Sequence, residues 1–116
     1  MSAFIAEPVS GTSLPGSMPP PEYFQEVRRI CDKYDVLFIA DEVIMGLGRT
    51  GKNFGIQHSG IEPDLITTAK GLCAGYGVLA AVLVSGPVCE AIATGSGSHT
   101  QGHTQYASEP RFQCTL

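Results

Sequence analysis

Residues 37–77 read LFIADEVIMGLGRTGKNFGIQHSGIEPDLITTAKGLCAGYG, and this stretch decides the fold. Two short apolar runs, residues 36–40 and 64–69, are followed directly by Asp41 and by Lys70. A continuous apolar run is typical of a strand that is buried on both faces of a parallel sheet. Residues just past the C-terminal ends of such strands line the ligand crevice. The sequence therefore predicts one carboxylate and one amine that face the same crevice from neighbouring strands.

The flanking segments predict the rest of an α/β sheet. Residues 4–6 form a short apolar run, and the apolar positions in residues 23–34 recur with a helical period. This pattern predicts a strand followed by a crossover helix. Residues 78–84 predict a last strand, and residues 88–93 are expected to begin a helix. Because a parallel crossover needs roughly a dozen residues or more, the short link between residues 69 and 78 predicts that this last strand is antiparallel.

The segment from Leu37 to Gly77 resembles the signature region of the class III aminotransferases, which are fold type I pyridoxal-phosphate enzymes. It combines an Asp-Glu-Val strand end, a Gly-Arg-Thr-Gly loop, a Pro-Asp-Leu strand start and an Ala-Lys-Gly strand end. The resemblance extends from about Phe4 to Tyr106. It implies a mostly parallel sheet with one antiparallel strand, and it implies that residues 1–110 are a fragment of the large cofactor-binding domain.

The resemblance also implies a role for each candidate site residue. Lys70 would form a Schiff base with the aldehyde of pyridoxal 5'-phosphate and then move a proton as a base. Asp41 would hold the pyridine nitrogen protonated, and Val43 would pack against the cofactor ring. Thr104, in a Gly-His-Thr segment, would reach the cofactor phosphate of the other subunit of a homodimer. Glu7, in a Glu-Pro-Val segment, would act as a substrate gate by pairing with an arginine outside this chain.

The chain has 116 residues, which is enough for one domain with a modest core. Family members are several times longer, so the chain is interpreted as a piece of an enzyme. Residues 111–116 depart from the family pattern and are interpreted as a divergent or truncated tail. The implied activity is the transfer of an amino group from an amine or ω-amino acid to a keto acid.

Composition excludes several other classes of function. The net charge is −4 and no basic stripe occurs, which argues against nucleic-acid binding. No apolar run has the length of a membrane span, and because no basic segment followed by an apolar one opens the sequence, no signal peptide is expected. The four cysteines lack CxxC spacing, which argues against a metal site and favours thiols of a reducing, cytoplasmic compartment.

The same residues allow three alternative interpretations. The segment Gly46–Asn53 nearly fits a phosphate-binding loop, but Asn53 lacks the hydroxyl that would bind magnesium, and the loop does not open a helix after its own strand. An aminomutase or a lyase of the same fold would share Asp41 and Lys70, because a fold does not determine a reaction. A truncated chain could also be non-catalytic by itself.

Overall fold

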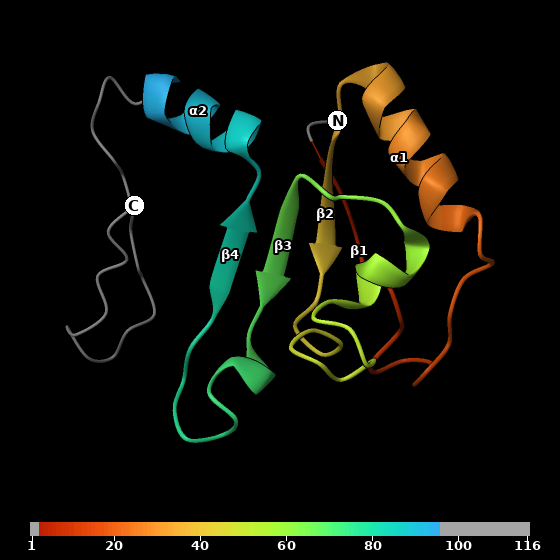
Figure 1. Ribbon diagram of the computed structural model, residues 1–116, viewed down its shortest axis with the longest axis vertical. Coiled ribbons are helices and arrows are strands. Elements are labelled where there is room, and N and C mark those ends of the chain that lie inside the picture. Colours follow the sequence, from red (N-terminus) through yellow and green to blue (C-terminus); the bar gives the residue numbers. More distant parts are fainter. Residues whose placement is uncertain (1–2, 96–116) are drawn as a thin grey trace. The chain divides into compact units, whose positions relative to one another are not determined.

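A computed structural model describes residues 3–95, and the chain divides after Leu83 into two units. The first unit contains most of a sheet whose strands are β1 (Ala3–Ala6), β2 (Leu37–Asp41), β3 (Leu65–Thr68) and β4 (Ala81–Val84), in the spatial order β1-β2-β3-β4. β1 pairs with β2 and β2 with β3 in parallel. Figure 1 shows β4 running opposite to β3. The predicted α/β sheet with one antiparallel strand is therefore confirmed.

Helix α1 (Tyr23–Tyr34) connects β1 to β2 and covers one face of the sheet (Figure 1). Its end is fixed by Asp35, which adopts the left-handed conformation with φ 51°, and by Val36, whose N–H donates to the Cys31 carbonyl at 2.9 Å. Because Val36 completes the helix end, β2 starts at Leu37, one residue later than the sequence predicts.

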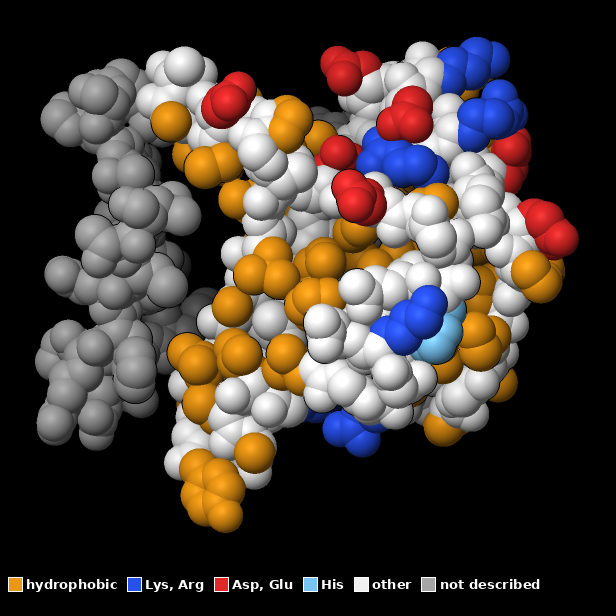
Figure 2. Space-filling model, in the orientation of Figure 1, with side chains coloured by type: hydrophobic (Ala, Val, Ile, Leu, Met, Phe, Trp, Pro, Cys, Tyr) orange, Lys and Arg blue, Asp and Glu red, His pale blue; other side chains and the backbone are white. Residues whose placement is uncertain are grey.

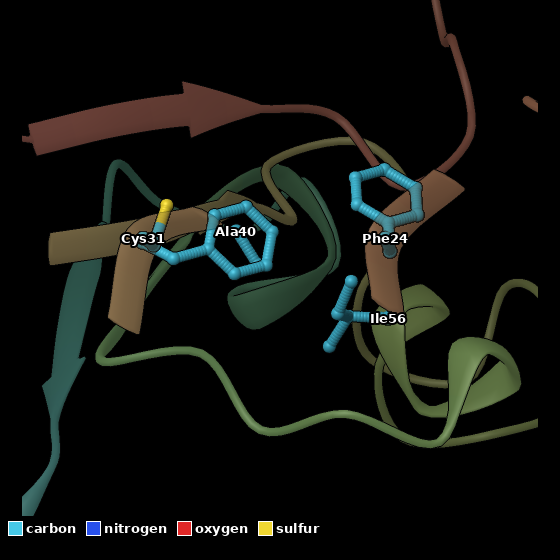
Figure 3. Close-up of a cluster of buried hydrophobic side chains, with 5 residues drawn as sticks. Phe24, Cys31, Ala40 and Ile56 are labelled. Carbon is cyan, nitrogen blue, oxygen red and sulfur yellow. The ribbon is translucent and has the colours of Figure 1, made fainter. Parts of the chain in front are cut away.

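The core lies between α1 and β2. Phe24 and Cys31 of α1 pack with Phe38 and Ala40 of β2, and Ile56 closes the cluster from the short 3-10 turn Gly55–Ser59. Figure 3 shows these side chains pointing toward one another. Since successive residues of a strand point to opposite faces, Leu37, Ile39 and Asp41 lie on the face away from α1.

Asp64 links the three elements around this core. Its Oδ2 accepts hydrogen bonds from the Phe38 N–H and from Arg28 Nη1 of α1, each at 2.7 Å. Its own N–H donates to the Phe38 carbonyl at 2.8 Å, just before β3 begins. One carboxylate at the start of β3 therefore joins α1 to β2.

The last strand is shorter in the structure than the sequence predicts. β4 begins at Ala81, and Val78 is 89% exposed. The connection from β3 turns at Ala74 and Gly75, both of which have positive φ, and this turn delays the start of the strand. Figure 2 shows hydrophobic side chains gathered over the region of β3 and β4, whereas charged side chains gather over α1.

The described part of the second unit consists mainly of α2 (Gly86–Gly95). The helix that the sequence predicted at residues 88–93 therefore exists and extends further at both ends. Among the described cysteines, Cys31 is buried, while Cys73 and Cys89 are only partly buried. Burial raises the pKa of the Cys31 thiol, which makes it a poor nucleophile.

Candidate functional site

Asp41 is the last residue of β2, and two hydrogen bonds hold its carboxylate. Its Oδ1 accepts hydrogen bonds from the Val43 N–H at 3.1 Å and from the Thr67 hydroxyl at 3.2 Å. Thr67 is also its register partner on β3. The other oxygen, Oδ2, has no hydrogen-bond partner within residues 3–95. The carboxylate therefore keeps one oxygen available to a ligand.

Lys70 follows β3 and opens the short 3-10 turn Lys70–Leu72. Its side chain is exposed and makes no ion pair with any residue of the described chain. Its backbone φ is +24°, a region that side-chain-bearing residues rarely adopt. Backbone strain of this kind is found mainly at functional sites, where the surrounding structure holds it in place.

The strand register brings three of the predicted site residues to one edge of the sheet. Ala6 pairs with Ala40, and Asp41 pairs with Thr67, so Glu7, Asp41 and Lys70 all lie at or just beyond the C-terminal ends of adjacent parallel strands. Glu7 Oε2 accepts the Gly11 N–H at 2.6 Å and thereby stabilises the loop after β1. The strand register thus places these three residues along one edge of the sheet, and their role in lining a crevice stays a prediction.

The segment that follows Asp41 folds back as a loop. Val43 is partly buried at its start. Leu47 N–H donates to the Asn53 carbonyl at 2.7 Å, and Arg49 Nε donates to the Ile44 carbonyl at 2.6 Å. These bonds hold residues 43–54 as an ordered turn. A phosphate-binding loop would lead into an α-helix, whereas only the short 3-10 turn Gly55–Ser59 follows Lys52.

Two contributors were not identified as site residues from the sequence. Thr67 holds the Asp41 carboxylate, and Glu42, the residue that follows Asp41, is 1% exposed. No local sequence pattern marks Thr67, because its contact with Asp41 depends on strand register. Thr104, the predicted phosphate contact from a second subunit, lies outside the described residues.

Pyridoxal phosphate suits the groups at this edge. A carboxylate with one oxygen anchored and one available can face a protonated ring nitrogen, and an unpaired exposed amine can react with an aldehyde. A separate pocket of about 220 Å³ is lined mainly by residues 18–25 and 55–59 and contains neither Asp41 nor Lys70. The chemistry of the donor groups, rather than this pocket, locates the candidate site.

The chain belongs to the class-III aminotransferase family, whose model matches residues 1–111. It is 52% identical over 100 residues to a diaminobutyrate–2-oxoglutarate transaminase of Halomonas elongata, covering 85% of this chain and 21% of that protein. It is 46% identical over 111 residues to a putrescine–pyruvate aminotransferase of Pseudomonas aeruginosa, covering 95% of this chain and 24% of that protein.

Solved structures agree with this assignment. A transaminase from the marine bacterium Virgibacillus superposes with a TM-score of 0.79 at 46% identity, over 87% of this chain and 22% of that one. The chain thus spans about a fifth to a quarter of the length of these relatives. None of the helices between residues 3 and 95 is long and apolar enough to cross a membrane. In the same residues, no group of three or more potential ligands could hold a metal ion.

Proposed function

We propose that the protein containing this segment is a pyridoxal-phosphate-dependent aminotransferase, with Lys70 as its catalytic residue and Asp41 as the partner of the cofactor ring. The observation that carries the proposal is the placement of two groups at the ends of neighbouring parallel strands. One is the Asp41 carboxylate, which is anchored by hydrogen bonds, and the other is the Lys70 amine, which has no ion-pair partner in the described chain. Family membership supports the same reaction class.

Bound pyridoxal phosphate would supply an electron sink for the bond that breaks at the substrate carbon. The Asp41 carboxylate, held by Thr67 and Val43, stabilises positive charge at the ring nitrogen. The Lys70 amine takes a proton from one carbon and returns it to another. Both residues act at the same edge of the sheet, so neither needs a large movement between steps.

The remaining contacts complete the proposed site. Val43 packs against the cofactor ring and excludes water, and Thr104 contacts the cofactor phosphate of the second subunit in a homodimer. Glu7 gates the substrate carboxylate, and it exchanges its bond with the Gly11 N–H for an arginine supplied from outside this chain.

The proposed substrates are an amine or ω-amino acid as donor and a keto acid as acceptor. The names of two relatives support this class, because one acts on diaminobutyrate with 2-oxoglutarate and another on putrescine with pyruvate. The proposed compartment is the cytoplasm.

Borohydride reduction in the presence of pyridoxal phosphate tests the proposal. The full-length protein containing this segment is reduced with borohydride, digested, and mapped by mass spectrometry. We expect the cofactor on Lys70, and we expect the Lys70→Ala variant to lose both the label and turnover.

Lys52 provides a matched control, because its Nζ donates to the Gln57 carbonyl at 3.0 Å and it lies away from the strand ends. Lys52→Ala is expected to retain the label on Lys70. Labelling spread evenly over Lys33, Lys52 and Lys70, or unchanged turnover in Lys70→Ala, would refute the proposed role of Lys70.

A further inference from the structure

Glu42 is a buried carboxylate at the base of the candidate site. Its side chain is on the opposite side of the strand end from Asp41, among the core residues, and Glu42 is 1% exposed. Its Oε1 accepts the Ile56 N–H at 2.7 Å. The side chain therefore reaches across the loop that follows β2 and binds the far end of that loop.

The backbone of Glu42 secures the near end of the same loop. Its N–H donates to the Thr67 carbonyl at 2.9 Å, which extends the pairing of β2 with β3 past Asp41. Its carbonyl accepts the Gly46 N–H, also at 2.9 Å. The loop that contains Val43 is thus held at both ends by one residue.

The packing around Glu42 leaves little freedom. A Cβ on Gly46 would lie 2.7 Å from the Glu42 carbonyl oxygen, and a Cβ on Gly55 would lie 3.3 Å from Glu42 Oε2 and 3.4 Å from Pro8 Cβ. Glycine at these two positions allows the loop backbone to approach the carboxylate closely. The position of the Glu42 carboxylate is therefore determined jointly by the segment that follows β1, by β2 and by the loop that follows β2.

Stability alone gives no reason for a carboxylate at this position. Oε2 is buried and has no hydrogen-bond partner among residues 3–95. Burial raises the pKa of Glu42, although the backbone N–H groups of Ile56 and Gly55 act in the opposite direction. A buried, incompletely paired carboxyl group destabilises a fold, and an apolar side chain of similar size would carry a smaller penalty.

We infer that Glu42 is a positioning residue for the cofactor site, which clamps the loop from Val43 to Ile56 across the end of β2 and so fixes Val43 and Asp41 toward the cofactor ring. The link is direct, because the Val43 N–H is one of the two donors to Asp41 Oδ1. If the loop shifted, Asp41 would lose the Val43 N–H as a donor, and the Val43 side chain would no longer face the cofactor ring. This inference rests on the proposed function and goes beyond it, since Glu42 touches neither cofactor nor substrate.

Three variants of the full-length protein test the clamp. Glu42→Gln keeps an oxygen acceptor of the same length for the Ile56 N–H. Glu42→Asp keeps the charge but is one methylene too short to reach it, and Glu42→Ala removes the acceptor. Each variant is compared with wild type by the pH titration of the visible absorption of bound pyridoxal phosphate, by kcat and KM, and by amide hydrogen exchange at residues 55–57 in the cofactor-free protein.

In Glu42→Asp and Glu42→Ala we expect faster amide exchange at Ile56 and a shifted pH for the titration of the cofactor absorption. We expect kcat to fall roughly tenfold to a hundredfold with KM little changed, by analogy with residues that orient a metal ligand without touching the metal. Glu42→Gln is expected to recover most of the rate and titration. If Glu42→Ala does not fold, the comparison of Glu42→Asp with Glu42→Gln still tests the inference.

The inference would be overturned if Glu42→Asp had the same cofactor titration and the same kcat as wild type. It would also be overturned if Glu42→Gln were as impaired as Glu42→Asp. Both results leave the proposed function intact. By contrast, a wild-type protein with no cofactor absorption band and no label on Lys70 would refute the proposed function itself.

Discussion

The hydroxyl of Thr67 donates to Oδ1 of Asp41 at 3.2 Å, and the two residues are register partners on adjacent parallel strands. The Asp41 carboxylate is therefore oriented by the sheet itself. Such orientation matters because a charge that the fold holds in place costs no rearrangement during the reaction.

Thr67→Val should lower kcat about tenfold while leaving the fold intact. Valine has nearly the shape of threonine and removes one hydrogen bond to a charged group, a loss of about 1.5 kcal/mol or more. Steady-state kinetics of the full-length protein would measure the change. An unchanged kcat would mean that the Val43 N–H alone orients Asp41.

Thr68→Val is the matched control on the opposite face of the same strand. Thr68 is 3% exposed, and its buried Oγ1 has no hydrogen-bond partner within the described chain. Removing an unsatisfied buried hydroxyl should stabilise the fold by about 1 kcal/mol and leave kcat unchanged. Urea unfolding would measure the gain, and a loss of stability would reveal a partner outside residues 3–95.

Asp41→Asn should retain cofactor and lose roughly a hundredfold or more in kcat. The amide keeps an oxygen for the Thr67 and Val43 donors but carries no charge to stabilise a protonated ring nitrogen. Absorption spectroscopy would confirm occupancy, and single-turnover kinetics would isolate the proton-transfer step. Wild-type rates in this variant would remove the proposed role of Asp41.

Asp64→Ala should destabilise the fold by about 2 kcal/mol, because Arg28 and the Phe38 N–H would both lose a partly buried acceptor. Asp32 supplies the control, since it also pairs with Arg28, at 2.7 Å, but is 65% exposed. Asp32→Ala should cost less than about 1 kcal/mol, as exposed ion pairs usually do. Equal losses in the two variants, measured by urea unfolding, would contradict the linking role of Asp64.

The strand ends were predictable from the sequence, whereas their neighbours were not. Asp41 and Lys70 could be placed at one crevice because apolar runs and the residues that close them are local features. The Thr67 contact depends on register between segments 26 residues apart, which periodicity does not determine. The hydrogen bond between Glu42 and Ile56 depends on how a glycine-rich loop folds back, which the local sequence pattern does not determine.

Glu42→Gln should change how stability depends on pH. Burial raises the pKa of Glu42 above its usual value of 4.5, so the folded protein holds a proton that the unfolded chain releases as the pH rises. Wild type should therefore lose stability as the pH rises from about 4.5 through the folded-state pKa. The Gln variant lacks this loss, and its advantage over wild type should grow between pH 4 and pH 8.

Urea unfolding at several pH values between 4 and 8 would measure that difference. Glu62→Gln removes an exposed carboxylate from the same unit and controls for the change in net charge. A constant difference between Glu42→Gln and wild type at every pH would show that Glu42 titrates alike in the folded and unfolded protein. The burial of its carboxyl group would then carry no electrostatic penalty, and stability would no longer count against a carboxylate at this position.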